Sequence, residues 1–140
     1  PLIISVPGKQ AAVSSSFVEL LDLYPTTASL CGLEVPTRLQ GKDLSPVLEN
    51  PKHQVRTAAF TVAGTSKGLL LRDESYAYIQ YGEDAKGGIE LFDMRKDPKQ
   101  YTNLAHSPGH AALVESFKTR VAEKLAAVRK NDLPVVRGSK

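Results

Sequence analysis

The stretch GLLLRDESYAYIQYGEDAKGGIELFD, residues 68–93, decides the fold of this 140-residue chain. It contains three short runs rich in Leu, Ile, Tyr and Phe, at residues 68–72, 76–81 and 89–93. Turn-forming Asp, Ser and Gly residues separate these runs, a pattern that is typical of antiparallel strands. A comparable run at residues 57–62 precedes them. The sequence therefore predicts a meander of four antiparallel strands.

A helix is predicted after the meander, from about Pro108 to Lys130, with Lys and Arg on its solvated face. Its apolar positions recur at helical spacing and are Ala112, Leu113, Phe117, Val121, Leu125 and Val128. The connection ELFDMRKDPKQYTNLA, residues 90–105, has a turn at Asp97-Pro98, where Asp side chains commonly accept hydrogen bonds from nearby backbone groups. We interpret it as a structural join rather than an active-site loop. The tail at 132–140 is predicted to be loose.

The first part of the chain has a different pattern. Leu2–Val6 is a β-branched run that is apolar on both faces, which indicates a strand buried inside a sheet. The chain offers no parallel partner for such a strand. We therefore expect its neighbours to lie upstream, and a start at Pro1 rather than Met fits a piece of a longer protein.

Two helices are predicted to follow. Residues 17–30 keep helical spacing, and Gly32 is a plausible stop. Pro25 falls inside this pattern and should break or restart the helix. A turn and a short helix are predicted over residues 39–48.

Composition argues against several classes of partner. The net charge is only +3 and the basic residues are scattered, so we expect no nucleic-acid partner. No apolar run is long enough to span a bilayer, so no membrane partner is expected. Cys31 is the single cysteine, which excludes an internal disulfide and a Cys-based metal cluster. With no basic neighbour in sequence, Cys31 is interpreted as a small buried hydrophobe.

The histidines do not form a convincing metal site. His106 and His110 are four residues apart, a spacing that could place two imidazoles on one metal if both lay on one helix. Pro108-Gly109 stands between them, so they are expected to straddle a helix start as exposed loop residues. His53 is also expected to be exposed. No P-loop, G-x-S-x-G or dinucleotide fingerprint occurs.

Five segments, in this order, closely resemble the C-terminal part of the sulfatase family, in the alkaline phosphatase superfamily. They are PLIISVPG, VELLDLYPTTASLCGLEVP, LQGKDLSPVLENP, LLLRDESYAYIQY and ELFDMRKDPKQYTNLA. The chain looks most like bacterial iduronate-2-sulfatase-like proteins, from Pro1 to about Leu125. The resemblance implies an α/β protein in which residues 1–55 are the C-terminal segment of a large α/β catalytic domain. Residues 56–140 would be a small subdomain, with a four-stranded antiparallel sheet and a packed C-terminal helix.

The resemblance also implies a reaction. Sulfatases hydrolyse sulfate esters with a formylglycine, made from the Cys or Ser of a C/S-x-P-x-R motif, and with a divalent cation, usually calcium. Ser5-Val6-Pro7-Gly8-Lys9 has nearly this layout, but Lys9 replaces the Arg and Ser5 lies in a predicted strand, so we interpret the match as coincidental. The family's motifs lie upstream of PLIISVPG. No catalytic or metal-binding residue and no cofactor is therefore assigned to this chain, which is expected to be inert alone.

What remains is the rim of the substrate pocket. Lys67, in the loop 63–68, and Arg72, at a strand end, are the candidates for contact with an anionic sugar. The alternative for both is a solvated hairpin loop with a strand-end Arg. Relatives often carry an Arg where Ala77 stands here, so the chain departs from the family's pattern at this position.

The resemblance implies two partners. One is the N-terminal catalytic part of the same protein, and the other is a sulfated small molecule or glycan, such as one with iduronate 2-sulfate. It also implies a periplasmic or secreted protein. Two rivals stay open. One is a phosphonate or phosphate monoester hydrolase of the same superfamily, and the other is a stand-alone module that binds sulfated glycans.

Overall fold

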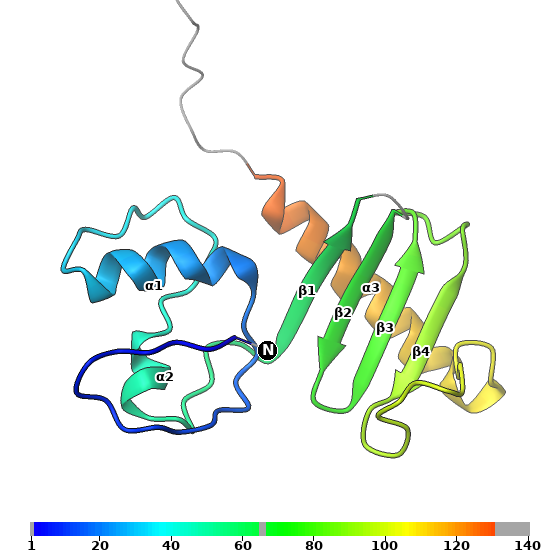
Figure 1. The fold of residues 1–140 in the computed structure, drawn as a ribbon. Coiled ribbons are helices and arrows are strands. Elements are labelled where there is room, and N and C mark those ends of the chain that lie inside the picture. Colours follow the sequence, from blue (N-terminus) through cyan, green and yellow to red (C-terminus); the bar gives the residue numbers. More distant parts are fainter. Residues whose placement is uncertain (1, 65–66, 131–140) are drawn as a thin grey trace, which may run out of the picture. The chain divides into compact units, whose positions relative to one another are not determined.

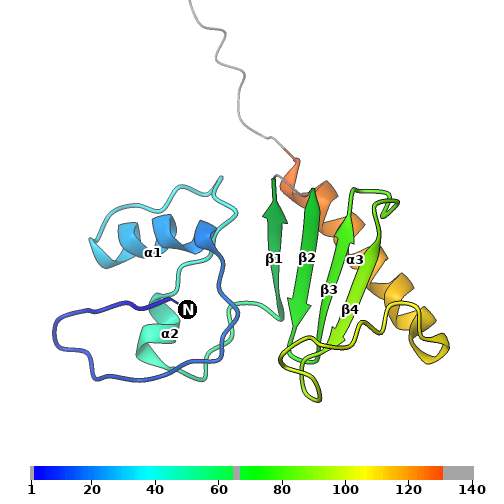
Figure 2. The same cartoon turned by 45° about the vertical axis from the view of Figure 1, so that its right-hand side comes forward.

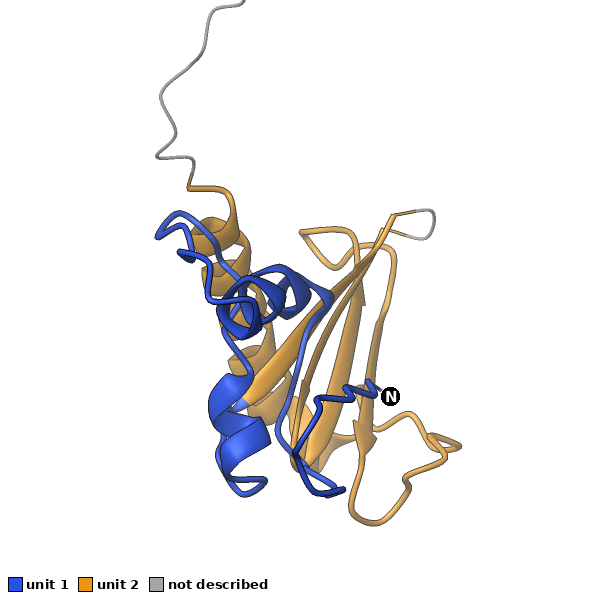
Figure 3. Ribbon diagram, turned by 60° about the vertical axis from the view of Figure 1, so that its left-hand side comes forward, with its two compact units in different colours: residues 1–57 blue, residues 58–140 orange. Residues whose placement is uncertain are grey.

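The computed structural model describes residues 2–64 and 67–130, so the predicted tail at 132–140 lies outside the described residues. The chain divides into two compact units, residues 1–57 and residues 58–140, which are coloured separately in Figure 3. Each unit is described by itself.

The second unit contains the predicted meander. Its strands are β1 (Ala58–Ala63), β2 (Gly68–Asp73), β3 (Tyr76–Tyr81) and β4 (Ile89–Asp93). They form one antiparallel sheet in the order β1-β2-β3-β4, as Figure 1 shows. The predicted antiparallel meander is confirmed, because alternating apolar runs and turn residues are signals carried within each hairpin itself.

Helix α3 (Ala111–Val128) covers one face of this sheet, behind the strands in Figure 2, and follows a short 3₁₀ turn, η2 (Pro108–His110). The strand register aligns the apolar residues of that face in a row that crosses the sheet: Phe60, Leu71, Tyr78 and Leu91. Tyr78 stacks on Phe117 of α3, with ring centroids 5.5 Å apart. Both side chains are fully buried. Burying such side chains is the main favourable contribution to this unit's stability.

The segment after β4 covers the outer edge of the sheet. The Oδ1 atom of Asn103 accepts the backbone N–H of Leu91 (3.0 Å), and the Leu104 N–H donates to the Leu91 carbonyl (2.8 Å). This side chain and its neighbour therefore satisfy edge groups of β4 that would otherwise be free to pair with another strand. Asp93 and Asp97 accept hydrogen bonds from backbone N–H groups of the turns, which supports the prediction of a structural join.

The first unit contains a 3₁₀ turn, η1 (Leu20–Asp22), and two helices, α1 (Leu23–Leu30) and α2 (Ser45–Glu49). Pro25 is tolerated because α1 begins only two residues earlier, where backbone N–H groups have no partner inside the helix. The predicted stop at Gly32 is confirmed. Its φ of +67° lets the Leu33 N–H return to the Ala28 carbonyl at 2.8 Å, which closes the helix end.

The predicted strand at Leu2–Val6 does not form. These residues are irregular, and Ile3 is 90% exposed. None of the four described strands is paired with this segment as a partner for backbone hydrogen bonds. A β-branched apolar run becomes a strand only when such a partner is present.

Candidate functional site

Lys67 lies where the chain enters β2, in an exposed position. Its φ is +52°, in the left-handed region that residues other than glycine rarely adopt. The Gly82 N–H donates to the Lys67 carbonyl oxygen at 3.0 Å, so the backbone conformation is held by the β3–β4 loop. The Lys67 ammonium forms no ion pair with any residue that the structure describes.

Arg72 lies near the far end of β2 and is also exposed. Its cross-strand neighbours are Ala59 on β1 and Ala77 on β3, on the sheet face opposite to α3. Ala77 is buried and Ala59 is half-buried, whereas Arg72 itself is exposed. Ala77 is the direct cross-strand neighbour of Arg72 on β3.

The two candidate residues are not brought together. Lys67 and Arg72 are separated by five residues of an extended strand, which corresponds to about 17 Å. They cannot contact the same sulfate group. If both face substrate, they contact different parts of an extended molecule.

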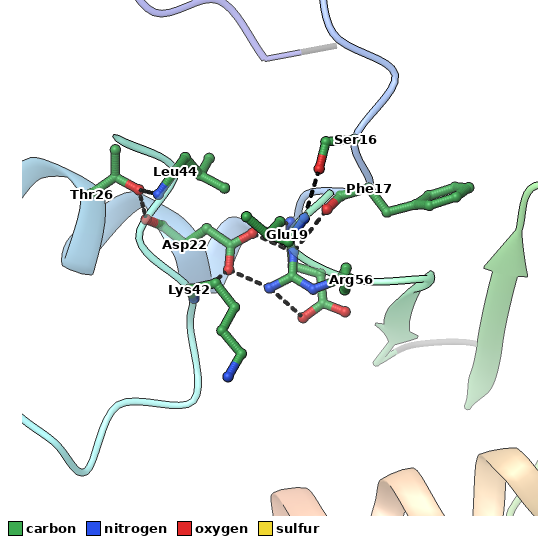
Figure 4. A network of polar contacts seen from close by, with 9 residues as sticks. Ser16, Phe17, Glu19, Asp22, Thr26, Lys42, Leu44 and Arg56 are labelled. Carbon is green, nitrogen blue, oxygen red and sulfur yellow. Dashed lines mark hydrogen bonds and ion pairs between the residues drawn. The ribbon is translucent and has the colours of Figure 1, made fainter. Parts of the chain in front are cut away.

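The first unit holds a polar cluster that sequence reasoning missed, shown in Figure 4. The Asp22 side chain is fully buried, and Arg56 donates to both of its carboxylate oxygens. The backbone N–H groups of Glu19 and Lys42 also donate to it, each at 2.7 Å. This cluster ties together segments that are 34 residues apart in sequence.

These donors determine the ionisation of the pair. Burial alone would raise the pKa of Asp22, but the hydrogen bonds from Arg56, Lys42 and Glu19 outweigh it and hold the pKa below its ordinary value. The hydrogen bond to Asp22 raises the pKa of Arg56. Both groups are therefore charged at neutral pH. Because every carboxylate oxygen is already bonded within the chain, the cluster serves structure rather than ligand binding.

Next to this cluster the backbone passes very close to itself. A Cβ at Gly41 would lie 2.0 Å from the Leu21 carbonyl oxygen, so only glycine fits. The Thr26 hydroxyl donates to the Asp22 carbonyl (2.6 Å) and accepts the Leu44 N–H (2.9 Å). The turn before α2 is thus fixed against η1 and α1.

The first unit also has an open apolar surface. An open groove of about 760 Å³ runs along the N-terminal segment and α2, and its lining includes Ile4, Val6, Val13, Val18, Val47 and Leu48. Nine large apolar side chains of this unit are exposed: Leu2, Ile3, Val13, Leu20, Leu21, Leu23, Tyr24, Leu30 and Leu33. Apolar exposure on this scale marks a surface that another part of a protein covers.

Comparison with known proteins decides the family. The family described as N-sulphoglucosamine sulphohydrolase, C-terminal, matches residues 1–127. The chain belongs to this sulfatase C-terminal family. Its structural neighbours are sulfatase-type domains of the alkaline phosphatase superfamily, which agrees with the fold expected from the sequence.

Individual relatives of this sulfatase C-terminal chain agree with the family match. A Delta 4,5-hexuronate-2-O-sulfatase of Bacteroides thetaiotaomicron is 35% identical over 115 residues, which cover 71% of this chain and 23% of the relative. The chain spans about a quarter of the length of the relatives it matches.

Solved structures support the same fold. A protein in complex with its substrate D-glucosamine-2-N,6-O-disulfate has a TM-score of 0.63 and 24% identity, covering 84% of this chain and 25% of that one. A phosphonate monoester hydrolase of Agrobacterium radiobacter has a TM-score of 0.59 and 27% identity, covering 81% and 25%.

The other residues considered from the sequence of this sulfatase C-terminal chain do not form a common site. The interpretation of Cys31 as a buried hydrophobe is wrong: it is the C-cap residue of α1 and is exposed. Ser5 is exposed in the irregular N-terminal segment, and His53 is exposed. His106 is exposed in a turn before η2, as expected, whereas His110 is half-buried and its Nδ1 has no hydrogen-bond partner among the described residues.

Across residues 2–64 and 67–130, no group of three or more His, Cys, Asp or Glu side chains could hold a metal ion. No helix in that same part of the chain has the length and apolarity needed to cross a membrane.

Proposed function

We propose that this chain is the C-terminal part of a sulfatase that hydrolyses sulfate esters of carbohydrates. The observation that carries the proposal is the family match over residues 1–127. The relative from Bacteroides thetaiotaomicron is named as a hexuronate-2-O-sulfatase, which favours a 2-O-sulfated uronic acid, such as iduronate 2-sulfate, as the substrate. The longer protein to which the chain would belong is called the parent protein below.

Within the parent protein, residues 1–55 complete the large α/β domain and residues 56–140 form its small subdomain. The exposed apolar side chains and the groove of the first unit support this role, because both require a covering layer. The Leu2–Val6 segment would gain its strand conformation by joining the sheet of that domain. The N-terminal part of the parent protein is therefore its first partner.

The resemblance implies that the formylglycine and the calcium ion would lie in the N-terminal part, so no step of sulfate hydrolysis is assigned to a residue of this chain. The test compares the parent protein with the isolated chain on 4-nitrophenyl sulfate and on a 2-O-sulfated unsaturated uronate disaccharide. The parent protein should hydrolyse both, and the isolated chain neither. Hydrolysis by the isolated chain at a comparable rate would contradict the proposal.

Lys67 and Arg72 would contribute to the rim of the substrate pocket. In the parent protein, Lys67→Ala or Arg72→Ala should raise KM for the sulfated disaccharide about three- to tenfold, because a charge contact to the substrate is lost. The kcat should not change, since neither side chain would touch the reacting sulfate. Lys96→Ala, which removes an exposed cation from the turn after β4, is the matched control and should leave KM unchanged.

A second candidate is a phosphonate monoester hydrolase. The structure from Agrobacterium radiobacter favours it, because its identity and TM-score are similar to those of the sulfatase neighbours. Rates of the parent protein on an aryl sulfate and on a phenyl phosphonate ester would separate the two. A stand-alone glycan-binding module instead predicts that the isolated chain binds a sulfated oligosaccharide, which calorimetry would detect.

The same resemblance leads us to place the parent protein in the periplasm or outside the cell. Sulfatase activity should then be found in the periplasmic or culture fraction of the producing bacterium. Activity confined to the cytoplasmic fraction would contradict this location.

A further inference from the structure

Gln80 is a buried polar side chain on a face that is otherwise apolar. It is 2% exposed and lies on β3 between Leu69 of β2 and Ile89 of β4, on the side covered by α3. A buried amide is costly unless its donors and acceptor are bonded. Its contacts therefore show what holds a polar residue in this position.

Every polar atom of Gln80 is used. Its Nε2 donates to the carbonyl oxygens of Gly82 (3.0 Å) and Glu83 (2.9 Å), and its Oε1 accepts the Tyr78 hydroxyl (3.3 Å). Two carbonyls can only accept, so the amide nitrogen must face them. Burial raises the pKa of Tyr78 to about 12, so its hydroxyl stays protonated as the donor. Tyr78 itself is held by stacking on Phe117.

The loop that Gln80 holds reaches Lys67. Gly82 has a φ of +82°, and its N–H points to the Lys67 carbonyl oxygen at 3.0 Å. Lys67 in turn keeps its left-handed backbone conformation. A chain of contacts therefore runs from the buried Tyr78 ring through Gln80 and Gly82 to the exposed Lys67.

A second support for the loop is weaker. Arg129, at the end of α3, forms an ion pair with the Glu83 carboxylate, but both side chains are about 60% exposed. Exposed ion pairs contribute little and are screened by salt. The buried amide of Gln80 is thus the principal anchor of the Gly82-Glu83 backbone.

We propose that Gln80 is a positioning residue that orients Lys67 toward an anionic group of the substrate, a sulfate or carboxylate on a sugar. The inference rests on the proposed rim role of Lys67. The inference adds that the buried Gln80 side chain determines the orientation of the Lys67 cation, by holding the β3–β4 loop in place.

The test uses the parent protein and Gln80→Met, which keeps the length of the side chain but removes all of its donors. KM for the sulfated disaccharide should rise about as much as in Lys67→Ala, roughly three- to tenfold, with kcat unchanged. KM for 4-nitrophenyl sulfate should not change, since that substrate has no second anionic group. The double variant should be no worse than Lys67→Ala alone, because both changes remove one contact.

Tyr78→Phe provides a milder variant, since it keeps the stacked ring and removes only the hydroxyl donor to Gln80. It should shift KM in the same direction by less, and amide exchange at Gly82 should accelerate. Val114→Ala, which truncates a buried residue of α3, is the control for general loss of stability and should leave KM unchanged.

A similar rise of KM in Gln80→Met and Lys67→Ala, with no further rise in the double variant, supports the positioning role. A KM change in Lys67→Ala with none in Gln80→Met or Tyr78→Phe overturns it, but leaves the rim role intact. Additive effects, or equal losses on both substrates, also overturn it. No KM change in Lys67→Ala removes the rim role itself.

Discussion

The second unit encloses an apolar core, whereas the first unit is organised around a buried ion pair. The core cluster lies wholly in the second unit and consists of Leu69, Leu71, Tyr78, Leu91, Ala105, Val114, Phe117 and Val121. In the first unit the fully or almost fully buried residues include the charged Asp22 and the polar Thr26. Among residues 2–64 and 67–130, nine of the eleven exposed large apolar side chains belong to the first unit, and the other two, Val62 and Tyr101, belong to the second.

The two units therefore differ in the interactions that stabilise them. Apolar burial between the sheet and α3 stabilises the second unit. A buried ion pair contributes little net stability, because the cost of removing both charges from water offsets much of their attraction. The Asp22–Arg56 pair does, however, determine which segments of the first unit lie together. The first unit is therefore specified by polar contacts, while many of its large apolar side chains stay exposed.

The largest effect is expected from Arg56→Met. This change leaves the buried Asp22 carboxylate without its charged partner, which costs about 3 kcal/mol or more. The loss should be confined to the first unit. Amide exchange at Lys42 and Leu44, whose N–H groups are bonded to Asp22 and Thr26, should accelerate, while exchange in β3 stays slow.

Lys9→Met is the matched control for this substitution. It also removes a cation from an ion pair of the first unit, with Glu49, but both side chains are solvent-exposed. The expected change is below about 1 kcal/mol. Equal effects of the two substitutions would show that the buried pair does not organise the unit.

A smaller but still local effect is expected from Gly41→Ala. The added Cβ meets the Leu21 carbonyl oxygen at 2.0 Å, and because that atom belongs to the backbone, the turn before α2 must move away from η1. We expect a loss of about 2 kcal/mol, measured by the same amide exchange. Gly109→Ala, where nothing lies within 4 Å, should change the free energy of unfolding by less than about 0.5 kcal/mol.

Much of the second unit could be predicted from sequence because its signals are local. The strands from Tyr76 and Ile89 begin where alternation and turn residues placed them. The turn at Asp97-Pro98 and the helix after Pro108 also follow from neighbouring residues. Antiparallel hairpins bring such signals together without long loops, so the sheet order needs no further information.

The first unit was predicted less well because its determinants are distant. Asp22 falls within an apolar helical pattern, and nothing near it in sequence indicates that Arg56 is its partner. The prediction of a strand at Leu2–Val6 was wrong for this chain, because strand formation depends on a paired neighbour and no described strand pairs with this segment. Likewise, Gln80 looks like an ordinary strand residue until the β3–β4 loop folds back over it.

The smallest expected effect is a difference between the two units in the pH at which their amides lose protection from exchange. Because Asp22 has a lower pKa in the folded chain than its ordinary 3.8, its ionised form stabilises the first unit above that pH. This contribution is lost as the pH falls through the folded pKa, so amide exchange at Lys42 should accelerate below about pH 4 before exchange in β3 does.

The Asp22–Arg56 pair is buried, so this loss of protection should be insensitive to salt, unlike the contribution of the exposed Glu83–Arg129 pair of the second unit. Arg56→Met should remove the acid-dependent step, since the carboxylate then loses the donor that contributes most to its low pKa. Loss of protection in both units at the same pH, with the same salt dependence, would contradict the contrast between an ion-pair-centred unit and an apolar one.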